Sequence, residues 1–144
     1  MCGTLKFNDI AKLRGEVIPV YNPNAKRYGM AVWDGFAHSD RQDWWIERGQ
    51  AVAVQVKVDA FVEGTMTFQV PKGQMIQALG LRKEVIVSGR AAGRAKQVKI
   101  LTRGPLNGFE AGIHKRWPLV LVNGNAYQFT PKDVIQGSVQ KELF

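Results

Sequence analysis

The chain has 144 residues, of which 45% are hydrophobic and 22% charged, a length and composition typical of one globular domain. Its single cysteine excludes an internal disulfide and a cysteine-rich metal site, and fits a reducing compartment, so we expect a cytoplasmic protein. We find no signal peptide and no apolar segment long enough to span a bilayer, so we expect no membrane partner. Lys and Arg number 20 against 12 Asp and Glu, a net charge of +8, which favours a polyanionic partner and nucleic acid first.

Gly and Pro recur along the whole chain, which favours many short elements over a few long helices. We expect a short helix over residues 40–48, which carries Trp44 and Trp45. Branched and aromatic residues predict strands over residues 51–58, 61–70 (interrupted at Gly64), 75–81, 85–88 and 98–102. The strand over residues 75–81 is expected to pair with the one before the turn at residues 71–73. A basic loop is expected over residues 89–94.

Two local signals stand near the carboxyl end. The apolar segments 119–122 and 126–129 flank Asn123-Gly124, the strongest hairpin signal in the chain. Thr130 as an N-cap, followed by Pro131 at the first helical position, predicts a short helix through Ile135. The elements together predict a single domain with a β-rich α+β fold, in which curved antiparallel or mixed sheets form a barrel-like core with a few short helices outside.

The amino terminus carries the main chemical signal. Met1 is followed by Cys2, the only cysteine, and by the small Gly3. Removal of Met1 leaves an α-amine with a pKa of about 8 and a thiol with a pKa of about 8.5 on neighbouring carbons of Cys2. Both are partly deprotonated near neutral pH, so both can attack one aldehyde carbon and close a thiazolidine ring. The alternative is a frayed terminus without a function.

A second segment makes the terminus more informative. Residues 112–121 read GIHKRWPLVL, an Ile-His-x-Arg-x-Pro cluster that runs into an apolar strand. Together with the Met-Cys-Gly start, this cluster resembles the SOS response-associated peptidase (SRAP) family. Residues 58–64, VDAFVEG, resemble that family's Asp-Gly-Phe-Tyr-Glu-Trp segment and align Glu63 with its active-site glutamate.

Other parts of the chain follow the same order. Tyr21-Asn22 resembles a loop near the family's active site, and Trp33-Asp34-Gly35-Phe36 looks like an altered Trp-Gly motif. Thr4 stands where the family commonly has Arg, the family's Asn-Ala-Arg segment is missing, and the chain is shorter than usual. We therefore expect a compact or divergent member.

The resemblance implies a protein that binds single-stranded DNA and crosslinks to its abasic sites through Cys2, with AP-lyase-like activity as a further expectation. It also implies autoproteolytic exposure of Cys2, although an ordinary aminopeptidase would serve. Cys2 is then the nucleophile, and Glu63 moves a proton near the amine and the imine. His114 protonates the sugar oxygen or assists reversal of the crosslink, since a histidine with a pKa of about 6.5 can both donate and accept a proton near neutral pH. No cofactor is expected, no metal-ligand spacing is present, and we expect a monomer.

Binding of the DNA strand requires cations for phosphates and aromatic rings for bases. A guanidinium matches phosphate oxygens well, and Asn22 could orient the sugar or serve only in a turn beside Pro23. The residues predicted to bind DNA are Asn22, Trp33, Trp45, Arg90, Arg94 and Arg116.

Two other functions remain open at this stage. A basic β-rich module could bind single strands without chemistry, as the missing Asn-Ala-Arg segment and Thr4 would allow. An amino-terminal-nucleophile glutamine amidotransferase also begins Met-Cys-Gly, but it is longer and carries further signatures in another order. Covalent capture of abasic DNA, plain binding and glutamate release from glutamine distinguish the three.

Overall fold

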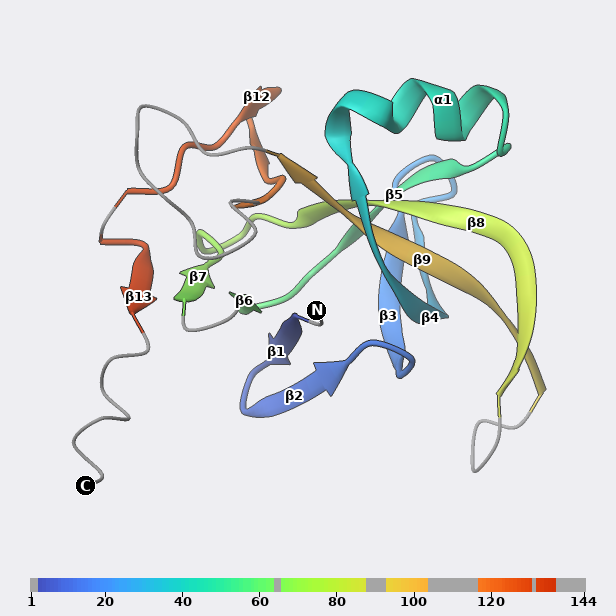
Figure 1. Cartoon of the computed structure of the whole chain (residues 1–144), viewed down its shortest axis with the longest axis horizontal. Helices are drawn as coiled ribbons and strands as arrows, with labels where there is room; N and C mark the ends of the chain where they lie inside the picture. Colours follow the sequence, from blue (N-terminus) through green and yellow to red (C-terminus); the bar gives the residue numbers. More distant parts are fainter. Residues whose placement is uncertain (1–2, 64–65, 88–92, 104–116, 131, 137–144) are drawn as a thin grey trace.

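The computed structural model describes residues 3–63, 66–87, 93–103, 117–130 and 132–136. Strands dominate these residues, and the one α-helix among them is short. The predicted β-rich α+β fold is therefore confirmed. Two main sheets, both curled, lie next to each other in Figure 1.

The first sheet contains the amino-terminal strand. Its five strands are antiparallel in the order β13-β7-β6-β1-β2. Their bounds are β1 Thr4–Phe7, β2 Ile10–Leu13, β6 Ala60–Glu63, β7 Met66–Gln69 and β13 Val134–Gln136.

The second sheet closes on itself into a ring of five strands. The ring runs β4-β3-β5-β8-β9 and returns to β4, with a parallel pairing between β4 and β9 and antiparallel pairings elsewhere. A sixth, very short strand, β10, pairs with β9. The bounds are β3 Val17–Asn22, β4 Arg27–His38, β5 Val52–Val56, β8 Ile76–Val87, β9 Gly93–Arg103 and β10 Trp117–Pro118.

A helical segment connects β4 to β5 where a helix was expected. The 3-10 turn Ser39–Arg41 leads into α1, Gln42–Glu47, and the segment lies along the outside of the ring (Figure 1). None of its residues is fully buried. The predicted short helix is confirmed.

The hairpin at Asn123-Gly124 is also confirmed. β11, Leu121–Val122, pairs with β12, Asn125–Ala126. The turn residues have φ values of +53° and +81°, which is the left-handed pair that a tight hairpin with right-handed twist requires.

The helix predicted after Thr130 is wrong. Residues 132–133 form a turn, and the next three residues pair with β7 as β13. The Asp133 carboxylate accepts hydrogen bonds from the Thr130 amide (2.9 Å) and hydroxyl (3.0 Å) and from the Tyr127 hydroxyl (2.7 Å). Asp133 therefore caps a turn, and the branched Val134 and Ile135 continue as a strand, where such residues are favoured.

The strands predicted in the middle of the chain are confirmed as strands, with three corrections. Residues 61–70 form two antiparallel strands, β6 and β7. The segments 75–81 and 85–88 belong to one long strand, β8, whose partners are β5 and β9 instead of β7. Gly93 and Arg94 lie in β9, while the rest of the predicted basic loop lies outside the described residues.

The described interior holds a large aromatic and aliphatic core cluster shared by both sheets and a smaller aliphatic one, formed by Ala37, Ala51, Leu79, Leu101 and Leu119. The largest fully buried side chains of the large cluster include Trp33, Phe61, Phe68, Trp117 and Phe129. Ring contacts link them in a chain, with centroid separations of 5.3 to 6.1 Å. Within the described part of the chain, no helix has the length and apolar character needed to cross a membrane.

Candidate active site

The start of β1 is held tightly against the core. Gly3 is buried, and a Cβ atom added to it would lie 2.7 Å from Cε1 of Phe61, 3.0 Å from Cζ of Phe36 and 3.0 Å from the Val62 carbonyl oxygen. Contacts below 3.0 Å are too close for a real Cβ. Only glycine therefore fits at position 3, which gives Gly3 of the Met-Cys-Gly sequence a structural reason.

Glu63 lies beside this start. Thr4 pairs with Val62 in the antiparallel register of β1 and β6, so one further step brings Gly3 opposite Glu63. Phe61 and Glu63 are both buried, and the intervening Val62 is only half-buried. Since side chains alternate along a strand, Glu63 lies on the core-facing side of β6.

The exposed fraction of Glu63 is only 5%. Glutamate is seldom buried to this degree unless it is paired, and Glu63 does have an interaction partner. The structure therefore argues against a solvent-facing strand carboxylate. Cys2 lies outside the described residues, but its Cα is bonded within about 3.8 Å of the Gly3 Cα by covalent geometry.

A bulge in β4 turns Phe36 toward the same place. Trp33 pairs with Val98 and Phe36 pairs with Ile100, so three steps on β4 match two on β9. Gly35, at φ +98°, takes up this irregularity. An extra residue puts Trp33 and Phe36 on one face, where their rings meet edge to face at 5.5 Å.

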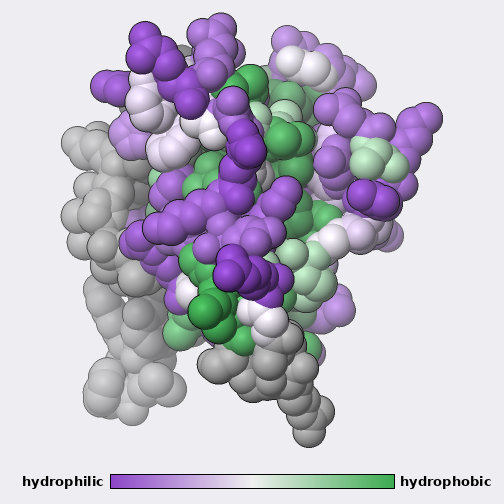
Figure 2. Space-filling model, turned by 90° about the vertical axis from the view of Figure 1, so that its right-hand side faces the viewer, coloured by the Kyte–Doolittle hydropathy of each residue, from purple (hydrophilic) through white to green (hydrophobic). Residues whose placement is uncertain are grey.

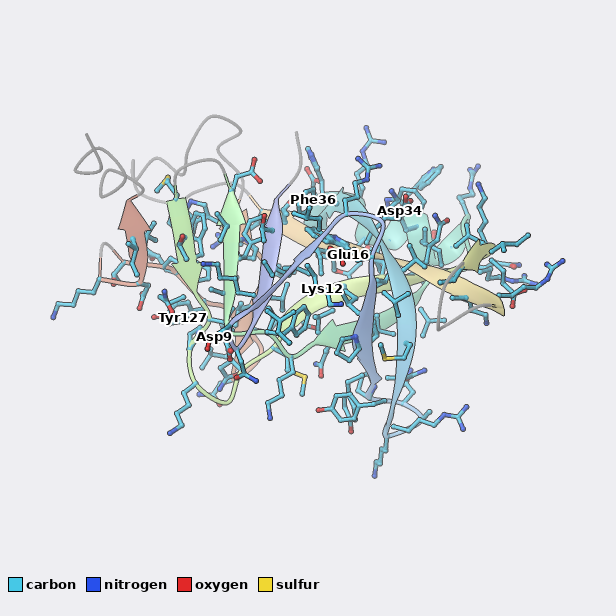
Figure 3. The ribbon with its side chains drawn as sticks, turned by 90° about the horizontal axis from the view of Figure 1, so that it is seen from below. Asp9, Lys12, Glu16, Asp34, Phe36 and Tyr127 are labelled. Carbon is cyan, nitrogen blue, oxygen red and sulfur yellow. The ribbon has the colours of Figure 1, made fainter. Side chains whose placement is uncertain are left out.

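Phe36 also lines an open hollow of about 450 Å³ between the end of β4 and α1. Figure 3 shows Phe36 next to the amino-terminal end of β1 and on the side of α1. This volume is in the range of small-molecule sites. The hollow combines aromatic rings with cationic or titratable groups, and its lining residues are Phe36, Ala37, His38, Arg41, Trp44 and Trp45.

Trp45 is fixed in place by its neighbours, whereas Trp44 is accessible. The two rings meet edge to face at 5.2 Å, and Trp44 is 49% exposed. Trp45 packs against the smaller core cluster, with the Lys99 ammonium 5.7 Å from the centre of its ring. Lys99 in turn forms an ion pair with Asp34 at 3.2 Å. Lys99 thus contacts both the bulge of β4, through Asp34, and the aromatic hollow, through Trp45.

A half-buried cation lies at the same end of the ring. Thr102 pairs with His38 of the hollow, and Arg103 follows it at the end of β9. Nη1 of Arg103 is buried and has no hydrogen-bond partner among the described residues. A guanidinium donates its N–H groups to anionic oxygens such as those of a phosphate, but Nη1 has no access to solvent here and is not open to DNA. We refer to Gly3, Glu63, Phe36, Arg103 and the hollow as the amino-terminal site.

Of the predicted catalytic residues, only Glu63 is described. His114, like the predicted DNA-binding residues Arg90 and Arg116, lies outside the described part of the chain. The described Trp117 pairs with Arg103 and contacts Phe68 at 6.0 Å, and Phe68 pairs with Phe61 across β6 and β7. Because His114 is three residues from Trp117, the chain can span at most about 11 Å between them.

The described DNA-binding candidates differ in their surroundings. Trp33 is fully buried, and its indole N–H donates to the Gly35 carbonyl at 3.0 Å. Such a ring cannot stack on a base, so Trp33 is a core residue, and this expectation is corrected. Oδ1 of Asn22 accepts the amides of Asn24 (2.9 Å) and Ala25 (3.2 Å), which is the turn role considered for it. Trp45 lines the hollow.

Arg94 does not lie at the amino-terminal site. It lies near the start of β9 with a side chain 74% exposed, at the other end of that strand from Arg103. Sequence reasoning also missed Arg41, His38 and Arg103 as site residues. Only Arg103 had a signal, because it closes the basic run that extends from residue 72 to residue 103.

No metal site is evident in the described segments, where no three His, Cys, Asp or Glu side chains gather. Comparison of the chain with protein-family models, with curated proteins and with solved structures gives no match. The geometry of the described residues therefore carries the functional argument.

Proposed function

We propose that this protein captures abasic sites in single-stranded DNA by forming a thiazolidine with Cys2. The observation that carries the proposal is the buried Glu63 on the core-facing side of β6, opposite Gly3, the residue bonded to Cys2, when the register of β1 and β6 is extended by one step. The family resemblance assigns Cys2 and Glu63 to one active site, although they lie 61 positions apart in the chain.

The reaction needs a proton carrier close to the amine. The Cys2 nitrogen adds to the C1′ aldehyde of the ring-opened sugar, and the resulting carbinolamine loses water to give an imine. The thiol then adds across the C=N bond, and its proton passes to the nitrogen. The sum is aminothiol plus aldehyde giving thiazolidine plus one water. Glu63 can deliver the proton that expels water and recover one on ring closure.

The hollow supplies the binding surface that the chemistry requires. Bases next to an abasic site lack one stacking neighbour, and exposed aromatic rings replace such stacking at about 1–3 kcal/mol per base. Trp44 is exposed in the hollow, and Phe36 connects the hollow to Gly3.

Intact-protein mass spectrometry tests the proposal. The protein is incubated with a single-stranded oligonucleotide that carries one abasic site, and the expected product has the summed mass of both minus one water. Cys2→Ser is the matched control, since it keeps an α-amine but cannot close a thiazolidine stable to denaturant. No mass addition to the natural protein with a processed terminus would refute the proposal.

Plain single-strand binding is the second candidate, because the aromatic and basic hollow favours it without any chemistry. In that case intact and abasic strands bind equally well, and Cys2→Ser changes neither affinity. Preferential and covalent retention of the abasic strand contradicts this candidate.

A further inference from the structure

Strands β8 and β9 continue beyond the ring as a two-stranded ribbon, which we define as residues 81–87 and 93–97. Its pairs run from Glu84↔Lys96 to Val87↔Gly93. In Figure 1 the end of the ribbon lies away from α1 and from the amino terminus. The ribbon is thus separate from the amino-terminal site, and nothing in the proposed chemistry uses it.

The ribbon has two different faces. Residues directly opposite in an antiparallel pair share a face, so Glu84, Ile86, Arg94 and Lys96 lie together. All four are exposed, and Ile86 is 82% exposed. This exposed face has no covering element among the described residues.

The opposite face is turned toward the body. Val85 and Val87 are half-buried there and, together with part of Ile86, line an open hollow with Glu16, Val17 and Val32. This face of the ribbon is thus directed toward the body, whereas the other face is directed toward solvent. The exposed face of the ribbon is therefore available to a partner.

A bulge adds two cations next to this face. Gly80 pairs with Val98 and Glu84 pairs with Lys96, so four steps on β8 match two on β9. The extra residues include Arg82 and Lys83, both exposed. Bulges of this kind twist a strand and redirect its side chains.

The ribbon carries four cations and one anion. The anion, Glu84, lies 3.8 Å from Arg94, and both side chains are largely exposed, so this pair contributes little. Figure 2 views the molecule from the side of the ribbon and shows a mainly hydrophilic surface with smaller hydrophobic areas. The excess of cations on the ribbon suits a polyanion.

We propose that the exposed face of the ribbon binds the backbone of duplex DNA. The described ribbon residues include no aromatic side chain, whereas surfaces for single strands use aromatic stacking. Duplex affinity comes mainly from phosphate neutralisation, and a two-stranded ribbon fits the major groove. The exposed Ile86 gives an apolar contact for the groove wall.

The ribbon and the amino-terminal site are joined by one strand. From Lys96 to Thr102, beside the hollow, β9 spans six residues, about 20 Å in extended geometry. This length corresponds to about six base pairs at 3.4 Å each. A junction between duplex and single strand would therefore fit the two surfaces together. The inference goes beyond the proposed function, since it holds for DNA without any lesion.

The test uses lesion-free DNA and the Cys2→Ala background, so that no covalent chemistry takes part. Fluorescence anisotropy measures the affinity for a 20-base-pair duplex and for its single strand across a salt series. We expect the triple variant R82A/K83A/K96A, which retains the Arg94–Glu84 pair, to weaken duplex binding about tenfold at low salt. For this variant, the slope of the logarithm of the duplex binding constant against the logarithm of the salt concentration should be smaller in magnitude by up to about 3, one unit per lost phosphate contact.

The matched control is K57A/K72A/K132A, which removes the same charge from exposed positions outside the ribbon. We expect the control to leave duplex affinity nearly unchanged, and single-strand affinity to be nearly unchanged in both triples. Equal losses in the two triples, equal losses for duplex and single strand, or no duplex binding by the parent protein would each overturn the proposal. A failure of Cys2 chemistry shows only in the mass experiment and leaves this result intact.

Discussion

The amino-terminal site and the ribbon differ in how the chain makes them. The site is closely packed around its start at β1: Gly3 has no space for a side chain, Glu63 is buried, and rings connect Phe36 to the core. The ribbon is open, with cations on side chains that touch little else. Activity at the amino-terminal site should therefore depend on the exact placement of its side chains, whereas DNA binding at the ribbon should depend on the number of its cations.

The largest expected effect comes from a side chain at the closest contact. Gly3→Ala places a Cβ 2.7 Å from the Phe61 ring and 3.0 Å from the Val62 carbonyl oxygen, so β1 must shift away from β6. A displacement of about 1 Å can cost a reaction about 100-fold. We expect the rate of adduct formation, followed by mass spectrometry, to fall by this order while single-strand affinity is retained.

Gly29→Ala is the control for that experiment. Gly29 lies in β4 with no atom within 4 Å of an added Cβ, so we expect the parent rate. A Gly3→Ala protein that reacts at the parent rate would mean that the fit between β1 and β6 does not position the nucleophile. A loss of DNA affinity equal to the loss of rate would indicate general misfolding.

The sequence predicted the parts of this fold that depend on local signals. Asn123-Gly124 sets its own turn, and the small and branched residues of 51–58 define β5. Strands β1 to β4 were not predicted, since β2 is largely exposed and the bulge at Gly35 breaks the alternation in β4. The helix after Thr130 failed because a distant strand, β7, pairs with Val134–Gln136.

For the site, motif order predicted Glu63, but only the register of β1 and β6 explains its burial beside Gly3. Trp33 was predicted to bind DNA because aromatic residues near polar ones suggest stacking, and the fold buries it instead. Arg41 and His38 come together with Trp44 only through the end of β4 and α1. Because Arg41 and His38 belong to no sequence motif, the sequence alone did not predict that they line one hollow with Trp44.

The next effect separates stacking from charge. Trp44→Ala removes an exposed ring from the hollow, and we expect single-strand affinity to fall by about 1–3 kcal/mol, or about 5- to 150-fold, with duplex affinity unchanged. Tyr28→Ala, which removes an exposed ring elsewhere, should change neither. If Trp44→Ala weakens the duplex as much as the single strand, the two surfaces are not distinct in function.

Combining the variants tests the independence of the two regions. Sites more than about 10 Å apart without shared partners contribute additively, and the ribbon and the hollow meet this condition along β9. On DNA with a junction, Trp44→Ala together with R82A/K83A/K96A should lose the sum of the separate free energies within about 0.5 kcal/mol. If anisotropy gives a clearly smaller loss of binding free energy than this sum, the Trp44 ring and the ribbon cations act in one binding mode that requires both.

The smallest effect concerns a turn that belongs to neither region. Partial burial raises the pKa of Asp133, but hydrogen bonds from Thr130 and Tyr127 outweigh it, and its pKa is lowered. A lowered folded pKa stabilises the protein above the unfolded value of about 3.9, and this contribution is lost as the pH falls through the folded value. We expect Asp133→Asn to reduce the melting temperature by a few degrees at pH 7, with the difference shrinking below about pH 4. Calorimetry across pH measures this. Adduct rate and both DNA affinities should stay at parent levels, since Asp133 touches neither the hollow nor the ribbon; a lost affinity would extend the DNA surface to this turn.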